Sequence, residues 1–530
     1  MRTLRLLALV VALPLAAHAQ APAKTRQAVP PAPPVAVPCE SADTSCMAPD
    51  VPREFRGVWV ASVSNIDWPS KPGLSTAEQK AELLAILDRT EAQRLNAVIL
   101  QIRPAADALY KSSIEPWSEY LTGRQGRAPS PAWDPLAFAV TEAHRRGLEL
   151  HTWFNPYRAR HPSAKGPLSK LHLSNTAPAL VKKYGTHLWM DPGESAVRKR
   201  TLRVVLDVVK RYDIDGIHLD DYFYPYKERT ADGTTEFPDA RSWKKYAASG
   251  GMLSRDDWRR ENVNTLVREL NEQIHAVKPW VKFGVSPFGI WRPGYPEQVK
   301  GFDAYEQLYA DSKLWWANNW VDYFTPQLYW PIAKPEQSYP ALMRWWGEQN
   351  TTNRHLWIGL YTSRVRASTP EGNGLAPSNA WTASEILAQV DTARAYPRVS
   401  GTIHFSMKAF LKDQGGVATQ LKAPYRALAL VPPSPWLSSG TPAAPVVRVK
   451  KNETTRGLSV TMTLPKPHVA RWYLLQSRTG GVWGSRLVAP RAGAEEISLN
   501  GDGLLPDRIV VTALDRAGVA SSAVRLMVAP

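Results

Sequence analysis

Residues 195–221, "SAVRKRTLRVVLDVVKRYDIDGIHLDD", hold the pattern from which the fold can be predicted. Up to Tyr212 the apolar residues recur every three or four positions, which is the spacing of one face of an amphipathic helix. A short apolar run over 216–219 follows and ends in Asp220 and Asp221. A helix that leads directly into a buried strand is part of a repeating βα unit. We therefore expect a parallel α/β sheet, with both carboxylates at the carboxyl end of one strand.

The same alternation of strand and helix extends in both directions along the chain. Ser75 followed by Glu78 forms a capping box, and Asp134-Pro135 supplies a cap and a first-turn proline, so helices are expected to begin there. Strands are predicted over 55–62, 97–104, 148–155, 216–221, 282–289, 321–330, 356–364 and 401–407. Eight such units predict a TIM (β/α)8 barrel with enlarged loops. The alternative is an open doubly wound sheet, which would usually begin with a glycine-rich turn that this sequence lacks.

Composition divides the chain into five parts. Residues 1–19, with basic Arg2 and Arg5 before an apolar run, predict a cleaved signal peptide. The other predicted parts are a Pro-rich disordered linker (20–52), the α/β barrel (53–431), a second linker (432–444) and a small all-β, fibronectin type III-like sandwich (445–530). We expect a periplasmic or secreted protein whose mature chain has no integral membrane segment.

The balance of charge and aromatic residues points to a class of ligand. The net charge is +17, and there are 21 Trp and 19 Tyr. This composition suits a protein that stacks its rings on planar or ring-shaped ligands and works near an anionic polymer, although basicity that only aids solubility is an equal alternative. The Lys and Arg residues form no long run, so nucleic-acid binding is not indicated.

The chain has two cysteines, Cys39 and Cys46, close together in the first linker. In an exported protein they are expected to form a small-loop disulfide. No other metal ligands lie near them in the sequence, so neither a metal site nor a cofactor is predicted.

In a TIM barrel the functional side chains lie at the carboxyl ends of the strands. The residues predicted there mix hydrogen-bonding groups with aromatic rings, which is what sugar hydroxyls and sugar faces require. The predicted substrate-binding residues are Arg103, Asp107, His151, Trp153, Asn155, Arg158, His218, Tyr222, Gln327, Tyr329, Trp330 and Tyr361. Each tryptophan taken singly could instead pack in the core, Arg103 and Asp107 could form a structural ion pair, and His218 could be a core histidine.

The adjacent carboxylates Asp220 and Asp221 are the predicted catalytic residues. Two like charges side by side repel, and burial increases the cost. Glycoside hydrolysis gives a reason for the pair, because it needs one protonated and one ionised carboxyl group. Successive strand residues face opposite sides, so both can reach one substrate only where the strand breaks into a loop.

Several long motifs resemble glycosyl-hydrolase-like family ten, the family of the divisome-localised type. They include "REFRGVWVASVSNIDWPS", "WDPLAFAVTEAHRRGLELHTWFNPYR", "YDIDGIHLDDYFYPY" and "DYFTPQLYW", and the resemblance covers about residues 53–410. It implies a TIM barrel that acts on peptidoglycan glycan strands, including strands stripped of stem peptides, with association with the divisome or cell wall. The acidic motif of the family falls on Asp220 and Asp221.

The resemblance leaves the mechanism open. Against the chitinase motif, Tyr222 stands where the acid glutamate would be. The Asp-Asp pair is similar to that of N-acetylglucosaminidases, which implies that Asp220 orients the acetamido group and Asp221 is the acid/base. In a competing scheme Asp220 is the nucleophile, and the acid is Asp221, Asp67, Asp107 or Glu119. The rivals from other classes are a non-catalytic cell-wall carbohydrate-binding protein on the same barrel and a metal-dependent deacetylase.

Overall fold

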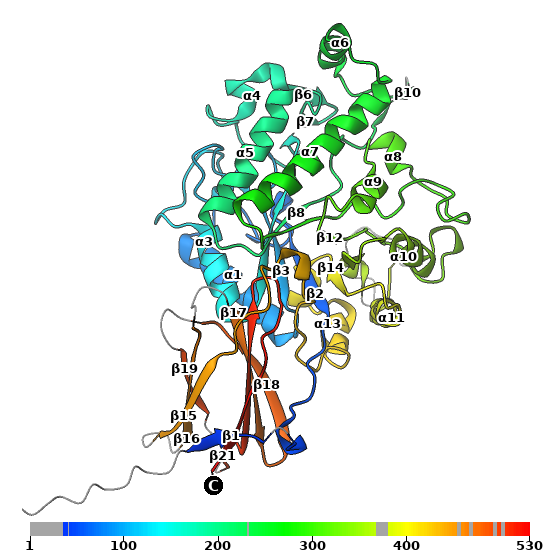
Figure 1. The fold of residues 1–530 in the computed structure, drawn as a ribbon. Coiled ribbons are helices and arrows are strands. Elements are labelled where there is room, and N and C mark those ends of the chain that lie inside the picture. The colour runs from blue at the N-terminus through cyan, green and yellow to red at the C-terminus, as the bar shows by residue number, and fades with distance from the viewer. Residues whose placement is uncertain are drawn as a thin grey trace, which may run out of the picture.

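Eight parallel strands close into a barrel, in the order β11-β12-β13-β14-β2-β3-β4-β8 (Figure 1). The computed structural model describes residues 35–40, 42–230, 233–366, 380–452, 457–465, 470–490, 495–499 and 504–529, and the predicted signal peptide lies outside them. The barrel strands are β2 (Phe55–Val60), β3 (Ala97–Arg103), β4 (Glu149–Phe154), β8 (Gly216–Leu219), β11 (Lys282–Val285), β12 (Tyr323–Phe324), β13 (His355–Leu360) and β14 (Gly401–His404). The predicted (β/α)8 barrel is confirmed.

Helices surround the barrel, so its strands are buried on both faces, which explains their nearly continuous apolar runs. The outer helices are α1 (Thr76–Ala92), α3 (Pro135–Arg145), α5 (Ser195–Arg211), α7 (Arg255–Val277), α9 (Ser312–Ala317), α10 (Tyr339–Glu348), α11 (Ala383–Arg394) and α13 (Val417–Leu421). The capping box of Ser75 and Glu78 is present, and the Asp134 side chain accepts from the amides of Leu136 and Ala137.

The loops at the carboxyl ends of the strands carry additional structure. The loop after β4 forms a small antiparallel sheet, and the loop after β8 carries a two-strand ribbon and a helix (Figure 1). These elements are β5 (Arg158–Arg160), β6 (Val181–Tyr184), β7 (His187–Met190), β9 (Arg229–Thr230), β10 (Gly233–Thr234), α2 (Glu119–Thr122), α4 (Leu173–Thr176), α6 (Ala240–Ala248), α8 (Ala304–Gln307) and α12 (Met407–Leu411). They build a deep rim around the mouth of the barrel.

The C-terminal module consists of two antiparallel sheets, β15-β16-β19 and β1-β21-β20-β17-β18. Leu458 and Val460 from the first sheet share a core with Leu475 and Ile509 from the second. The strands are β1 (Ala36–Pro38), β15 (Val446–Asn452), β16 (Gly457–Thr463), β17 (Ala470–Thr479), β18 (Val482–Val488), β19 (Glu495–Leu499), β20 (Arg508–Asp515) and β21 (Val524–Val528).

Both predicted linkers contain ordered chain. In the first, β1 pairs with β21, Cys39 and Cys46 form a disulfide, and Gln476 donates to the carbonyl of Pro49. The prediction of disorder is therefore wrong for the described residues of 35–52, because this segment completes the edge of the C-terminal sheet. In the second linker, the indole of Trp436 donates to Asp322 at 2.8 Å, so the segment is bound to the barrel.

The module packs against the amino-terminal end of the barrel, opposite the rim (Figure 1). Arg471 lies at a bulge in β17 and contacts Asp213 and Asp215, each at 2.9 Å, just before β8. Burial would raise the pKa of Asp215, but the charges of Arg471 and His144 hold that pKa well below its usual value. Gly147 has a φ of 71°, and a side chain there would meet Leu487 of the module.

Candidate active site

The two adjacent carboxylates lie just beyond the carboxyl end of β8, where the strand ends at Leu219. Asp220 is 4% exposed and Asp221 is 5% exposed. Since the regular strand has already ended, the two side chains are not held on opposite faces, as the sequence argument required. The structure therefore brings both carboxylates to the mouth of the barrel.

The two carboxylates have different hydrogen-bond partners. Asp220 Oδ2 accepts from the Nδ2 of Asn155, whereas its Oδ1 is buried and has no partner among the described residues. Both oxygens of Asp221 are used: the hydroxyl of Tyr226 donates to Oδ2, and Gln327 Nε2 donates to Oδ1 at 3.1 Å. Asp220 thus has one oxygen free for a ligand, while Asp221 is held in place by two donors.

The protonation of the pair follows from these surroundings. Burial raises the pKa of Asp220 to about 7; the charge of Asp221 acts in the same direction, and that of Arg158 opposes it. Burial also raises the pKa of Asp221, but the bonds from Tyr226 and Gln327 favour its ionised form. Near neutral pH the site therefore favours one proton on Asp220 and a negative charge on Asp221.

Asn155 is oriented by a network of donors. Its Oδ1 accepts from Gln101 Nε2 at 2.7 Å and from Arg158 Nη1 at 3.1 Å, which leaves only its Nδ2 to face Asp220. The Oε1 of Gln101 is fixed in turn by the amides of Ser62 and Val63. The Arg158 guanidinium also stacks on the ring of Tyr222 at 4.4 Å. Loops after β2, β3 and β4 thus cooperate to hold Asp220.

Arg103 has a supporting position. It is fully buried and forms a two-pronged ion pair with Glu115, with both N–O distances 2.7 Å, and it donates to the carbonyl of Asn155. The anticipated Arg103–Asp107 pair does not form. All of the described contacts of Arg103 are internal, so it stabilises the loop that carries Asn155.

Half-buried aromatic rings surround the mouth. The rings of Tyr329 and Tyr361 lie 4.9 Å apart, and Phe405 packs near both. Trp330 meets Phe288 edge-on at 5.5 Å. Rings that keep part of their surface accessible can stack on the apolar faces of sugars. The structure thus brings Tyr222, Gln327, Tyr329, Trp330 and Tyr361 to the same end of the barrel as the Asp pair.

The two predicted histidines lie inside the barrel, below the mouth. Because the Trp59 indole can only donate, Nε2 of His218 must accept its bond at 3.1 Å. Nδ1 of His218 contacts the hydroxyl of Tyr323, which also contacts His151, and His151 reaches Glu149. Burial lowers the pKa of His218 well below its usual value. Both rings are fully buried and hydrogen-bonded within the barrel, so the structure does not bring them to the cleft.

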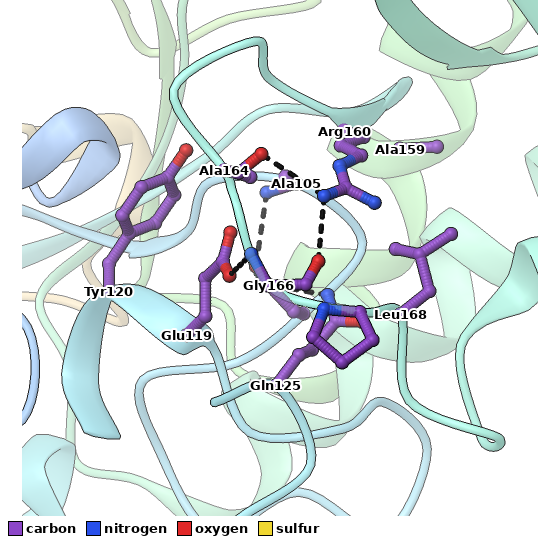
Figure 2. Close-up of a pocket in the computed structure, with 11 residues that line it drawn as sticks. Ala105, Glu119, Tyr120, Gln125, Ala159, Arg160, Ala164, Gly166 and Leu168 are labelled. Carbon is purple, nitrogen blue, oxygen red and sulfur yellow. Dashed lines mark hydrogen bonds between the residues drawn. The ribbon is translucent and has the colours of Figure 1, made fainter. Parts of the chain in front are cut away.

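Asp107 lies beside the mouth, in a small pocket between the loops after β3 and β4 (Figure 2). It accepts from the amide of Ala105 and from Gln125, each at 3.2 Å, and burial raises its pKa to about 7. The pocket has a volume of about 10 Å³, enough for one water molecule and too small for a sugar.

Trp153, another predicted substrate-binding residue, is buried. Burial raises the pKa of Asp220, and the polar N–H group of Trp153 acts weakly in the opposite direction.

The other proposed acids are engaged elsewhere. Asp67 accepts from the amides of Ala61 and Lys408 and from the hydroxyl of Ser406, at 2.7–2.8 Å. Glu119 accepts from the amide of Gly166 at 2.9 Å. Through these contacts both carboxylates stabilise the loops around the mouth of the barrel.

Tyr226 is a residue of this site that the sequence prediction missed, and Gln101, expected at the end of its strand, was not among the predicted substrate-binding residues. Tyr226 is five positions from Asp221 and closes a turn back onto it. Its signal was the run of aromatic residues after the Asp pair. Gln101 carried the weaker signal of a polar residue near the end of a buried strand.

The described residues offer little for a metal ion. Among them, one group of three possible ligands is close enough together: Cys39, Asp43 and Cys46. Both cysteines of that group form the disulfide. Within the same described residues, no helix combines the length and apolar character needed to cross a membrane.

A family model described as "Glycosyl hydrolase-like 10" matches residues 54–373, which include both aspartates and Gln327. The chain belongs to the glycosyl hydrolase-like 10 family. Glycosyl hydrolase YngK of Bacillus subtilis is 43% identical over 403 residues, 74% of this chain and 76% of the relative. Glycosyl hydrolase DigH of Escherichia coli K12 is 34% identical over 388 residues, 68% of this chain and 85% of the relative.

Membership of the glycosyl hydrolase-like 10 family agrees with the barrel and with the position of the carboxylates. Among solved structures, the glycoside hydrolase domain of PgaB (BpsB) from Bordetella bronchiseptica is 12% identical, with a TM-score of 0.45. The match covers 72% of this chain and 99% of that domain, a likeness too low to bear on function. The family and its curated relatives make a glycoside hydrolase-like function the coarse conclusion.

Proposed function

We propose that the protein hydrolyses glycosidic bonds of N-acetylhexosamine-containing glycan strands, and that its substrate is peptidoglycan stripped of stem peptides. The observation that carries the proposal is the unequal Asp pair at the barrel mouth. Asp220 has a free oxygen and a pKa raised to about 7, whereas Asp221 is held as a carboxylate by Tyr226 and Gln327. A protonated and an ionised carboxyl group side by side are what glycoside hydrolysis requires.

The environments favour roles opposite to those taken from the resemblance. Asp220 is the general acid, because it holds the proton and its buried Oδ1 has no hydrogen-bond partner among the described residues. It donates that proton to the leaving glycosidic oxygen and later takes a proton from water. Asp221 is the ionised partner, which accepts the N–H of the acetamido group so that the acetamido oxygen attacks the anomeric carbon. Tyr226 and Gln327 position Asp221 for this step.

The substrate class rests on the half-buried rings around the pair and on the family resemblance. The predicted signal peptide would deliver the chain to the compartment that contains this polymer. Association with the divisome or cell wall is part of the same proposal. The C-terminal module lies at the opposite end of the barrel, where it leaves the mouth open to a long strand.

The test is mass spectrometry of the products from peptide-free strands, with wild type, Asp220→Asn and Asp221→Asn. We expect reducing-end oligosaccharides from wild type and a loss of at least about 100-fold in each variant. Products with anhydro ends would identify a lyase instead. Full activity in both variants would refute the site. Tight binding without products from any form would favour the carbohydrate-binding alternative.

A further inference from the structure

The loop between β4 and α5 has an unusual charge composition. Residues 155–190 contain no Asp or Glu. They contain six cationic residues: Arg158, Arg160, Lys165, Lys170, Lys182 and Lys183. Lys165 and Lys170 are exposed. Lys182 pairs with Asp191 near the end of the loop at 3.7 Å, and Arg158 is buried. The exposed Lys165 and Lys170 therefore leave uncompensated positive charge on the rim of the barrel.

The neighbouring loop after β3 adds to this charge. Its cations Arg124 and Arg127 are exposed. Its acidic residues between 104 and 133 are all buried: Asp107, Glu115 and Glu119. The charges that could neutralise the surface are thus turned inward, and Glu115 is already paired with Arg103.

Hydrogen bonds tie the two loops into one surface, beside the pocket of Figure 2. The amide of Ser169 donates to Gln125 at 3.0 Å, and the amide of Gly166 donates to Glu119 at 2.9 Å. Thr122 donates to the carbonyls of Arg124 and Arg127, each at 3.0 Å, which fixes that turn.

We call Arg124, Arg127, Lys165 and Lys170 the basic rim. None of the four forms an ion pair within the part of the chain that the structure describes. Leu171, directly after Lys170, is 69% exposed and gives the surface an apolar patch. The basic rim is therefore a preformed cationic surface whose charges are available to an external anion.

Two residues of the basic rim, Lys165 and Lys170, belong to the same loop as the groups that orient Asp220. Arg158 begins β5 in that loop and bonds Asn155, which bonds Asp220. A strand with one sugar at the Asp pair would extend over the neighbouring rim, because the mouth is bounded on that side by the loops after β3 and β4.

We propose that the basic rim binds the carboxylates of an anionic glycan strand, outside the sugar that is cleaved. This inference rests on the proposed function and specifies how the substrate is distinguished. In a strand without stem peptides every N-acetylmuramic unit carries a free lactyl carboxylate, whereas an attached peptide converts that group into a neutral amide. The rim thus recognises the carboxylate next to the sugar ring, which only peptide-free strands carry.

The experiment measures binding of fluorescently labelled peptide-free strands to the full chain. The rim variant is Arg124→Glu/Arg127→Glu/Lys170→Glu; Lys165 is kept because its Nζ donates to the carbonyl of Pro162. The matched control is Lys199→Glu/Arg203→Glu/Lys210→Glu, three exposed residues of α5. A second probe is the same strands with their carboxylates converted to methylamides.

We expect the rim variant to bind the anionic strands about tenfold more weakly than wild type, since three exposed contacts each contribute modestly. The difference should shrink in high salt and vanish with the amidated strands. Equal affinity of the rim and control variants for the anionic strands would overturn the inference. Equal affinity of the wild type for the anionic and the amidated strands would overturn it too, and so would failure of the wild type to bind either. Cleavage is scored separately. Charge-dependent binding without products would refute the proposed hydrolase activity and support the proposed role of the basic rim. Cleavage that is unaffected by the rim substitutions would support the hydrolase activity and refute the role of the rim.

Discussion

Replacement of Asp220 by asparagine should stabilise the folded protein at alkaline pH and have little effect at acidic pH. The folded-state pKa of Asp220 is about 7, against an ordinary value of 3.8. Between these values the folded state binds a proton that the unfolded chain does not, so stability falls as the pH rises. Above pH 7 the ionised form carries the full cost of burial beside Asp221.

The magnitude follows from the shift. At about 1.36 kcal/mol per pKa unit, the ionised Asp220 destabilises the fold by roughly 4 kcal/mol at pH 8. Asparagine removes this charge, and its carbonyl oxygen can still accept from Asn155. Since the amide also adds a donor that needs a partner, we expect a net gain of about 2 kcal/mol at pH 8 and almost none at pH 4.

The assay is the melting temperature of Asp220→Asn and wild type across this pH range. The control is Asp67→Asn, because Asp67 is also buried with its pKa raised, to about 6, yet its oxygens accept three hydrogen bonds. An amide cannot accept all three, so this control should lose stability even at pH 8. A stability difference between Asp220→Asn and wild type that is independent of pH would refute the argument.

Two further predictions concern the groups around the Asp pair and the module. Tyr226→Phe removes a donor to Asp221, so the acidic limb of the kcat/KM profile should move up by about one pH unit. Tyr224→Phe removes a buried hydroxyl that has no hydrogen-bond partner among the described residues, so it should leave the profile unchanged. An identical profile in the Tyr226 variant would contradict the assignment of Asp221. Arg471→Met leaves Asp213 and Asp215 without their shared cation and should lower the free energy of unfolding by about 3 kcal/mol, measured by denaturant titration. Arg478→Met, which breaks a solvent-screened pair with Asp507, should lower it much less. Equal losses in the two variants would refute the proposed role of Arg471 in docking.

The repeated alternation of short apolar strands with capped helices made the barrel predictable. The eight strands are short apolar runs between helices with clear caps, as at Ser75 and Asp134, so local pattern and fold agree. The Asp pair was predictable for a related reason, since two carboxylates after a buried strand have no obvious structural purpose. Local sequence thus specified the strand ends and the position of the two carboxylates just beyond β8.

Contacts between distant residues were not predictable in this way. His151 was expected at the mouth, but in a barrel a position three residues before the end of a strand lies inside, where Tyr323 and Glu149 satisfy it. Arg103 was expected to bind substrate, but it forms a buried ion pair with Glu115. Glu115 lies in a loop whose sequence has no periodic pattern from which this contact could be predicted. The linker around β1 looked disordered because a strand of three residues has little periodicity. Its partner strand lies at the other end of the chain.

The pairing of β1 with β21 has a consequence for the order of folding. Ala36 lies opposite Val528, so two strands that are far apart in the sequence are joined in one sheet. Such a long-range closure cannot form until both strands have been synthesised, and contacts this distant in sequence form slowly. Until then the backbone groups of the sheet edge are unpaired and can add a strand from another molecule. A chain that lacks β1 would keep its barrel mouth intact and yet expose an adhesive edge, so its expected failure is aggregation.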